Sequence, residues 1–513
     1  MKIREKRSAS NSIARIVFVG ISVLFQVGWL LLLILKLNNY SFYINIFTTV
    51  LALLVVLQLY ARHSAAAMKM PWIMLILAFP VMGLSLFLMM DIFGDLGKTG
   101  KRLRSIEKIT RGSLPQNPSV QEELKKQDLA AGNISSYIWR HAEAPIYANT
   151  LTHYFRDASD AFEAMKRDLR NAREYIFLEY FIVEDSEAFG QIREILTQKA
   201  AAGVDVRLMY DDIGSIGYAN FRFAKALEKQ GIQCRVFNPA LPILNLFMNN
   251  RDHRKIAVID GVVGYTGGYN LANEYFHITH PYGHWKDTGV RLEGDAVRSL
   301  VASFLEMWHV GSFHEQPPLI PGAYSALMPV SDGFVQPYTD SPLRGERVAE
   351  NVYLNLIGAS SGSLWFMTPY LIISDEMISA LGLAAKRGVD VRIITPGIPD
   401  KKTVYQVTRS YYGSLASQGV RIFEYSPGFC HAKQCLCDGV MASVGTSNLD
   451  YRSLYHHFEN NVFLYSGTAV EQMKEDFENT FSQCTEVTER YSTGRGRVLR
   501  TWQCILRLIA PLM

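Results

Sequence analysis

The chain has 513 residues, of which 49% are hydrophobic and only 19% charged, and its formal net charge is +4. This length allows more than one domain and a sizeable core. A charge this mild does not by itself indicate a nucleic-acid-binding protein. The small share of charged residues reflects long apolar segments near the N-terminus.

Three apolar runs open the chain, at residues 16–37, 43–61 and 71–93. A helix of about 20 apolar residues spans a bilayer, and helices of a protein core rarely run so long. The first run is too long for a signal peptide, and a second run follows it at once. We therefore predict an N-terminal membrane anchor of two or three transmembrane helices within residues 1–95. Pro80 and Gly83 make the third run the candidate for an imperfect crossing.

Basic residues flank this region on both sides. They are Lys2, Arg4, Lys6 and Arg7 before the first run, and Lys98, Lys101, Arg102, Arg104, Lys108 and Arg111 after the third. Because cytoplasmic flanks are enriched in Lys and Arg, both sides are predicted to face the cytoplasm, which three full crossings cannot satisfy. Either one run is re-entrant, or two runs form a pair that does not span, or one flank breaks the rule. We expect a multi-pass protein of the cell membrane, with a basic linker at residues 96–149 and a cytoplasmic catalytic domain.

A repeated segment divides the rest of the chain into two related halves. GVDVRLMYDD at residues 203–212 matches GVDVRIITPG at residues 388–397, and each follows a strand-like run and a helical pattern. Strands that alternate with helices indicate parallel βαβ units. We therefore predict an α/β fold in which residues 150–312 and 328–485 are two halves related by a pseudo-twofold axis. A proline-rich linker at residues 313–327 joins them.

A nine-residue motif occurs once in each half, as HRKIAVIDG at residues 253–261 and HAKQCLCDG at residues 431–439. The shared residues are His253, Lys255 and Asp260 in the first copy, and His431, Lys433 and Asp438 in the second. On a strand, side chains two residues apart point to the same face, which places each Lys beside its His. Asp-Gly predicts a hairpin turn, where aspartate is common for backbone reasons, so a structural role for the two aspartates stands beside a catalytic one.

Further polar residues recur behind each motif. An asparagine follows, Asn270 or Asn448, and then an acid at the head of a β-like run, Asp287 or Glu459. Phosphodiester transfer needs a nucleophile, an acid for the leaving oxygen and positive charge on the phosphoryl oxygens. Two imidazoles can provide the first two, and two lysines with two asparagine amides can provide the third. The motifs therefore predict one phosphodiester-transfer site built from both halves.

An acid that is hydrogen-bonded to an imidazole fixes its tautomer and raises its basicity. We predict that Asp287 serves His253 in this way. Glu459 is predicted to serve His431, and Glu274 is a weaker candidate for a supporting role. Ordinary charges at the edge of a strand are the alternative for the two acids.

No metal or other cofactor is expected. Cys430, Cys435 and Cys437 crowd the second motif, but the last two are spaced as on one face of a strand. The chain has no paired C-x-x-C. We therefore expect reduced cysteines, and lysines that neutralise the phosphate charge.

Two further segments favour contact with lipid. The stretch NPALPILNLFMNNRD at residues 238–252 is an apolar insertion before the first motif. The tail at residues 486–513 mixes arginines with apolar residues, which is typical of a basic amphipathic helix on an anionic membrane surface. Packing against the catalytic domain remains the alternative for both segments.

On these paired motifs the chain resembles the phospholipase D superfamily, and within it the bacterial cardiolipin synthases. The resemblance extends to PWIMLILAFPVMG, WKDTGVRLEG, TPYLIISDE, GTSNLDYRS and HHFENNVF. It implies that two phosphatidylglycerol molecules become cardiolipin and glycerol. His253 would form a phosphatidyl-histidine while His431 acts as acid and then as base, although the symmetry of the motifs allows the reverse.

Other activities fit the same motifs. A hydrolytic phospholipase D would use water as the acceptor, and a related synthase would use another phospholipid or alcohol. A membrane lipid-binding scaffold derived from an enzyme is the non-enzymatic alternative, but both motifs are intact. The predicted partners are phosphatidylglycerol and anionic membrane lipid. A nucleic acid is not expected, because the apolar runs argue against a nuclease of this superfamily.

Overall fold

The computed structural model describes residues 21, 24–25, 28, 31–32, 41–62, 66–94, 97–219, 221–239, 249–310, 332–492, 506–508 and 510, without the side chains of 41–45, 89–94, 97–99 and 221. Four predicted segments fall wholly or mostly outside this part of the chain. They are the apolar run 16–37, the apolar part of the insertion 238–252, the linker 313–327 and the tail 486–513. Of the tail, Leu506 and Ala510 are buried against the core of the second half.

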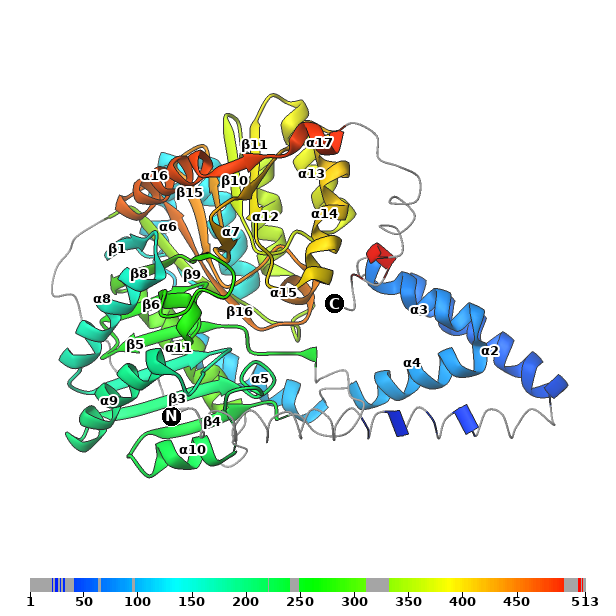
Figure 1. The fold of residues 1–513 in the computed structure, drawn as a ribbon, viewed down its shortest axis with the longest axis horizontal. Coiled ribbons are helices and arrows are strands. Elements are labelled where there is room, and N and C mark those ends of the chain that lie inside the picture. Colours follow the sequence, from blue (N-terminus) through cyan, green and yellow to red (C-terminus); the bar gives the residue numbers. More distant parts are fainter. Residues whose placement is uncertain are drawn as a thin grey trace.

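Each half is built on one mixed sheet, and the two sheets repeat the same strand order (Figure 1). The first has the order β1-β8-β6-β5-β2-β3-β4, and the second has β9-β16-β15-β14-β10-β11-β12, with β17 beside β12. The first sheet comprises β1 (Thr150–Phe155), β2 (Tyr175–Tyr180), β3 (Asp205–Asp211), β4 (Gln233–Phe237), β5 (Lys255–Ile259), β6 (Val263–Gly267) and β8 (Gly289–Gly294). The second comprises β9 (Phe334–Asp340), β10 (Ser363–Met367), β11 (Asp390–Pro396), β12 (Arg421–Tyr425), β14 (Gln434–Cys437), β15 (Met441–Gly445), β16 (Glu459–Tyr465) and β17 (Cys484–Glu486).

The strand pairing confirms two predictions, the parallel βαβ units and the hairpin at each Asp-Gly turn. In each half the two βαβ units give three parallel strands, β2–β3–β4 and β10–β11–β12. The motif strand pairs antiparallel with the strand after its Asp-Gly turn, as β5–β6 and β14–β15. The glycine of each GVDV segment ends the preceding helix, with φ of +90° at Gly203 and +95° at Gly388, a left-handed conformation that glycine adopts without a Cβ clash.

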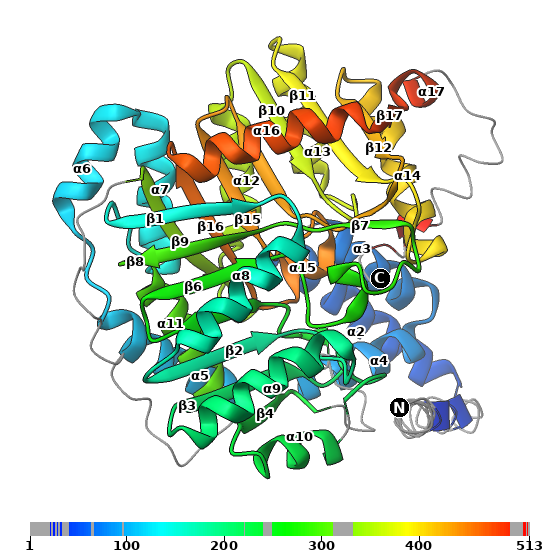
Figure 2. The same cartoon turned by 60° about the vertical axis from the view of Figure 1, so that its left-hand side comes forward.

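Helices cover both faces of each sheet (Figure 2). The helices of the first half are α8 (Ala158–Asn171), α9 (Glu187–Ala201), α10 (Phe221–Glu228) and α11 (Val297–Val310), with the 3₁₀ turn η3 (Asn273–Phe276). Those of the second are α12 (Val348–Ala359), α13 (Asp375–Lys386), α14 (Lys402–Ala416), α15 (Tyr451–Tyr455), α16 (Thr468–Ser482) and α17 (Thr488–Ser492). Helices α8 and α9 belong to a core separate from that of α11, so they lie on opposite faces of the first sheet.

Side chains alternate between two cores along each motif strand, and one of these cores is shared by the two halves. In β5, Ala257 faces the core of its own half, while Val258 faces a core shared by both halves. In β14, Cys435 and Cys437 face the core of the second half, while Leu436 faces the shared core. The two cysteines thus share one face of a strand, as predicted. The shared core holds the two motif strands together, which fixes the positions of the residues that precede them.

A short parallel ribbon also crosses between the halves. It pairs β7 (His284–Lys286) with β13 (Gly428–Cys430). The ribbon leads directly into Asp287 on one strand and His431 on the other. It is therefore the backbone element that brings a residue of the first half to the second motif.

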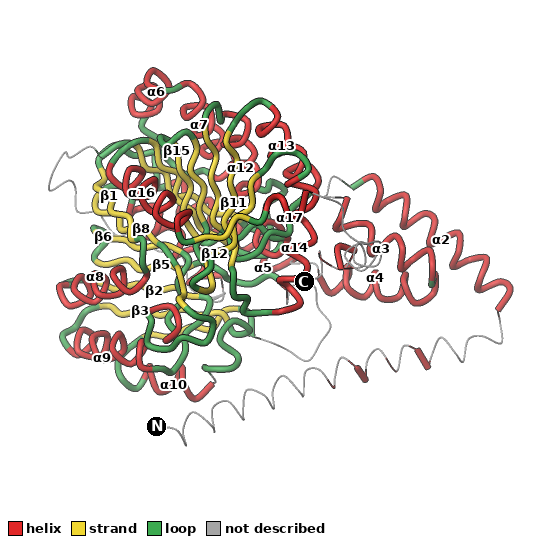
Figure 3. Tube along the Cα trace, turned by 45° about the horizontal axis from the view of Figure 1, so that its top comes forward, coloured by secondary structure: helices red, strands yellow, loops and turns green. Residues whose placement is uncertain are grey.

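The N-terminal helices project from the catalytic domain (Figure 3). They are α2 (Ser41–Ala61), α3 (Ala66–Ala78) and α4 (Pro80–Gly94). Over the described part of the chain, no helix combines the length and apolarity that a bilayer crossing requires. The predicted transmembrane helices at 43–61 and 71–93 are therefore not supported. The second of these runs is interrupted at Phe79, because Pro80 lacks the amide proton that a continuous helix needs.

The predicted linker at residues 96–149 contains three helices, α5 (Gly97–Gly112), α6 (Pro118–Gln127) and α7 (Leu129–Ala142). They pack on the domain through apolar side chains such as Leu103, Leu124 and Ile138. Arg111 of α5 is also buried against Glu306 of α11, with a closest nitrogen–oxygen distance of 2.7 Å. This segment is part of the folded domain.

Candidate active site

The two repeated histidines lie at the junction of the halves. His253 precedes β5 and His431 precedes β14. The prediction that each histidine lies on the motif strand is therefore wrong. The His253 amide donates to the carbonyl of Phe458 at 3.0 Å, and the His431 amide donates to that of Lys286 at 2.7 Å. The backbone at each motif is thereby attached to the opposite half.

Each imidazole is held by an acid of the opposite half. Nδ1 of His253 lies 2.9 and 3.0 Å from the carboxylate oxygens of Glu459. Nδ1 of His431 lies 2.6 Å from a carboxylate oxygen of Asp287. Both predicted acids thus contact an imidazole, but the predicted pairing is wrong. The backbone hydrogen bonds between the halves are the reason. The residue whose carbonyl accepts a hydrogen bond from each histidine's amide directly precedes the acid that holds the imidazole.

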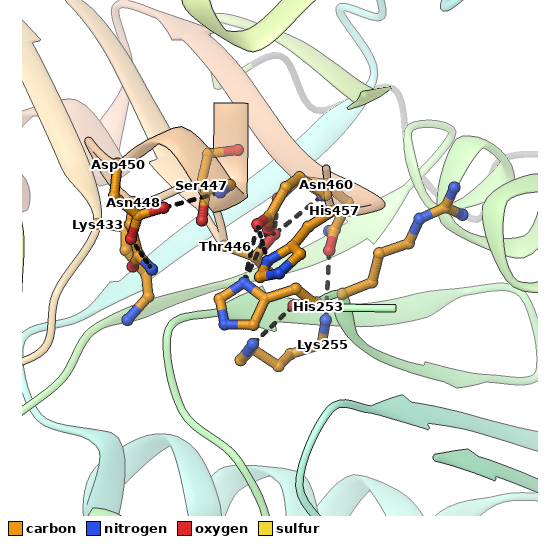
Figure 4. A network of polar contacts seen from close by, with 12 residues as sticks. His253, Lys255, Lys433, Thr446, Ser447, Asn448, Asp450, His457 and Asn460 are labelled. Atoms are coloured by element: carbon orange, nitrogen blue, oxygen red, sulfur yellow. Dashed lines mark hydrogen bonds and ion pairs between the residues drawn. The ribbon is translucent and has the colours of Figure 1, made fainter. Parts of the chain in front are cut away.

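Both motif lysines are almost fully buried beside their histidines, each 1% exposed. Nζ of Lys255 donates to the carbonyl of His253 at 2.6 Å (Figure 4). Nζ of Lys433 donates to the carbonyl of His431 and lies 2.8 Å from its Nδ1. Burial lowers the pKa of Lys255 to about 7 and that of Lys433 to about 8. The charge of Lys433 also lowers the pKa of Lys255, so the two lysines belong to one electrostatic cluster that an entering phosphate would neutralise.

The two histidine–acid pairs differ in charge. Burial lowers the pKa of His253 to about 3, so its imidazole is neutral. Burial alone would raise the pKa of Glu459, but His253 and His457 outweigh it and hold that pKa below its usual range, which leaves a carboxylate. In the other pair, burial raises the pKa of Asp287 to about 7 against the charge of Lys433. Asp287 is therefore protonated for a large part of the time near neutral pH.

The contacts of Lys433 favour one tautomer of His431. A protonated lysine only donates hydrogen bonds, so its contact with Nδ1 makes that nitrogen an acceptor. Nδ1 has a single lone pair, so a protonated Asp287 donates to it in place of Lys433 and not together with it. The proton of His431 then lies on Nε2. In His253 the carboxylate of Glu459 draws the proton to Nδ1, so Nε2 carries the free lone pair.

The supporting residues are less uniform. Asn270 accepts from the amide of Ile182 at 3.0 Å and donates to the Tyr275 hydroxyl at 2.8 Å. Asn448 donates to Asp450 at 3.0 Å, and its amide oxygen is buried without a hydrogen bond. Both asparagines are thus buried and oriented. Glu274 lies on η3, half-buried, and no contact joins it to either histidine among the described residues.

The two motif aspartates lie in turns. Asp260 and Asp438 have φ of 52° and 51° at the far ends of β5 and β14, roughly 20 Å from the histidines for strands of this length. The Asp260 carboxylate accepts from three successive amides, at Arg173, Glu174 and Tyr175. That of Asp438 does the same at the start of β10. Their contacts are structural and do not reach the reacting groups.

Two residues that the sequence did not single out complete the pocket around Glu459. The ring centroid of His457 lies 5.3 Å from that of His253, and its Nδ1 lies 3.6 Å from Glu459. The Thr446 hydroxyl donates to the second carboxylate oxygen. His457 precedes the predicted acid by two residues, and this spacing was the available signal. Thr446 occupies an ordinary strand-end position, for which no such signal exists.

Comparisons with known proteins identify the family of the chain. The family described as cardiolipin synthase, PLD-like domain, matches residues 165–308 and 353–481. An uncharacterized protein of Streptococcus mutans is 41% identical over 86% of this chain and 96% of its own. A cardiolipin synthase of Halalkalibacterium halodurans is 33% identical over 92% of this chain and 94% of its own. A cardiolipin synthase 2 of Bacillus cereus is 32% identical over 91% and 90%.

A solved structure shares the fold. A phosphatidylserine synthase of Haemophilus influenzae superposes with a TM-score of 0.52 at 13% identity, over 74% of this chain and 99% of its own. At this identity the likeness concerns the arrangement of the two α/β halves.

Proposed function

The chain belongs to the cardiolipin synthase family with a PLD-like domain and is a phosphatidyltransferase, and on this premise we propose that it converts two phosphatidylglycerol molecules to cardiolipin and glycerol. The observation that carries the proposal is the crossed pairing of the two histidines with Glu459 and Asp287. It gives two imidazoles of opposite tautomer in one site. One is prepared to attack and the other to donate a proton.

His253 is the proposed nucleophile. With Nδ1 hydrogen-bonded to the carboxylate of Glu459, its Nε2 lone pair attacks the phosphorus of the first phosphatidylglycerol. The positive charge that develops on the imidazole is stabilised by that carboxylate. The product is a phosphatidyl-histidine, and the bond from phosphorus to the glycerol oxygen breaks.

His431 and Asp287 supply the proton that glycerol needs. Nε2 of His431 gives its proton to the departing oxygen while Asp287 gives its own proton to Nδ1. In the second step the transfer reverses. Nε2 takes the proton of a hydroxyl of the second phosphatidylglycerol, Nδ1 returns its proton to Asp287, and the alkoxide displaces His253 from phosphorus. Both histidines thus return to their starting tautomers.

Lys255 and Lys433 would hold the phosphoryl oxygens. Their lowered pKa values reflect burial without a fixed counter-charge in direct contact, and a phosphodiester anion would raise both. Membrane attachment is part of the proposal, because the lipid substrate resides there. The exposed apolar side chains of α2, among them Phe47 (67% exposed) and Leu57 (64% exposed), support contact with lipid.

The experiment is a product analysis. The full chain is purified in detergent and given phosphatidylglycerol alone. Cardiolipin with one equivalent of glycerol is the expected outcome. Phosphatidic acid would show that water is the acceptor, and no turnover would require another acceptor lipid or alcohol. Either result would overturn the proposed reaction.

The assignment of the nucleophile has its own test. Phosphatidylglycerol labelled in the phosphate is added to the wild type and to a His431→Ala variant, and the protein is quenched and analysed for phosphohistidine. We expect label on His253 in both, at a lower rate in the variant because glycerol leaves without its proton donor. Label on His431 in a His253→Ala variant would reverse the order of events.

A further inference from the structure

A second cluster of histidines lies at the ribbon that leads into the active site. Asp157, His277 and His284 come from the start of α8, the end of η3 and the start of β7. Their candidate ligand atoms all lie within 4.8 Å of one another. We propose that these three side chains bind a divalent transition-metal ion of the zinc type, which fixes the β7–β13 ribbon next to the Asp287–His431 pair.

Two of the distances between donor atoms are close to those of a tetrahedral site. Nε2 of His277 lies 2.9 Å from Oδ2 of Asp157, and Nε2 of His284 lies 3.6 Å from the same oxygen. Zinc bonds of about 2.0 Å in a tetrahedron separate neighbouring ligand atoms by roughly 3.3 Å. The three side chains thus need only small shifts to surround an ion. They are partly exposed, which leaves room for a water molecule as the fourth ligand.

Two of the three side chains, His284 and Asp157, have the outer contacts that metal ligands need. Nδ1 of His284 is hydrogen-bonded to the Tyr425 hydroxyl at 3.0 Å, which leaves Nε2 for an ion. Oδ1 of Asp157 accepts from the amide of Ser159 at 2.8 Å and from its hydroxyl at 2.6 Å. Both ligands are therefore oriented by the protein. Because Tyr425 belongs to the second half, the site connects the two halves.

The surrounding charges permit a cation. Lys286 is the nearest basic group on the same ribbon, but its ammonium is paired with Asp476 at 2.8 Å. Asp160 adds negative charge near His277, and His280 stacks on the ring of His277 with centroids 6.0 Å apart. The closeness of His277 and Asp157 has a competing explanation, a hydrogen bond from protonated His277 to Asp157 without any metal ion. That explanation requires neither His284 nor Tyr425, so variants of these residues separate the two.

The test measures metal binding directly and does not depend on the proposed reaction. The full chain in detergent is freed of metal with a chelator and titrated with Zn²⁺ by calorimetry. We expect one saturable site in the wild type. In His277→Asn and His284→Asn the affinity should fall at least about tenfold, and in Tyr425→Phe by about tenfold through the loss of the outer hydrogen bond. His141→Asn, which removes an exposed histidine of α7, should bind as the wild type does.

Two results would overturn the proposal. One is the absence of saturable binding in the wild type, or equal binding in all variants. The other concerns the second group of possible ligands in the described residues, His253, His457 and Glu459. If His457→Asn abolished binding while His284→Asn retained it, the ion would belong to the active site. Thermal unfolding with and without Zn²⁺ adds a readout, because an ion that binds only the folded protein raises Tm in the wild type but not in His284→Asn.

Discussion

Replacing Glu459 by Gln tests the tautomer that the crossed pairing imposes on His253. The carboxylate oxygens lie 2.9 and 3.0 Å from Nδ1, and the Thr446 hydroxyl donates to one of them. In the variant, the amide oxygen keeps the hydrogen bond from Thr446, so the amide nitrogen faces Nδ1. An N–H donor at that position competes with the amide oxygen, which stays 3.0 Å from Nδ1, and favours the tautomer in which Nδ1 accepts and the imidazole proton lies on Nε2. The nucleophilic lone pair is then lost.

The size of the effect follows from two contributions. Loss of a hydrogen bond to a charged group costs about 1.5–3 kcal/mol, or roughly 10- to 150-fold in rate. An inverted tautomer costs more, since the corresponding change in a serine protease triad lowers kcat by about 10⁴-fold. We therefore expect kcat of Glu459→Gln to fall between about 10²- and 10⁴-fold. The assay is the initial rate of cardiolipin formation from labelled phosphatidylglycerol in mixed micelles.

Asp287→Asn is the matched variant, because its amide still donates to Nδ1 and retains the tautomer of His431, but it delivers no proton. Its defect in the first step, followed as the burst of p-nitrophenol, should therefore disappear with phosphatidyl-p-nitrophenol, whose leaving group needs no proton, whereas that of Glu459→Gln should persist. Glu274→Gln, which contacts neither histidine, controls for an unspecific effect of losing an acid and should stay within about twofold of the wild type. A loss below about fivefold in Glu459→Gln, or its rescue by the activated ester, would refute the assignment of His253.

Three further predictions concern pH and stability. Because burial brings the pKa of Lys255 and that of Asp287 to about 7, and both act in their protonated forms, kcat/KM should fall as the pH rises above about 7; a flat profile from pH 6 to 9 would contradict this. Asp438→Ala removes a carboxylate that binds three amides, so it should lower the free energy of unfolding by about 2 kcal/mol in denaturant titrations while the folded protein keeps its kcat. Arg111→Ala leaves Glu306 buried and unpaired and should cost about 3–5 kcal/mol in the same titration, and a smaller loss would mean that water reaches Glu306.

The sequence predicted the two halves because the two-residue period of strands and the 3.6-residue period of helices are both clear in it. The GVDV segments, the apolar strand runs and the Asp-Gly turns each depend on local chemistry, and each appears where predicted. The helices at 97–142 were assigned to a linker because most of their residues are polar. Only a few apolar side chains, such as Leu124 and Ile138, pack on the core. Of the apolar runs in the described part of the chain, 43–61 forms a single helix, Pro80 interrupts 71–93, and neither is supported as a bilayer crossing.

The site was predictable in composition but not in connectivity. Spacing and repetition identified the histidines, the lysines and both acids. The pairing failed because proximity along the chain suggested an acid from the same half as its histidine. Which carboxylate reaches which ring depends instead on the ribbon between β7 and β13 and on the backbone bond from His253 to Phe458, and both are contacts between the halves. Contacts of this kind produce no periodic pattern in the sequence of either half, so the sequence alone does not predict them.

The crossed pairing has a consequence for how activity depends on folding. Each half provides the histidine of one pair and the acid of the other, so neither half alone can orient its own imidazole. The shared core of β5, β14, α11 and α16 is then a requirement of the chemistry as well as of stability. The duplication also explains why the pairs can differ. Equivalent positions in the two sheets receive different surroundings, a carboxylate beside Thr446 and His457 on one side and a carboxyl group beside Lys433 on the other. In the proposed mechanism, a symmetric fold thereby holds one imidazole ready to attack and the other ready to donate a proton.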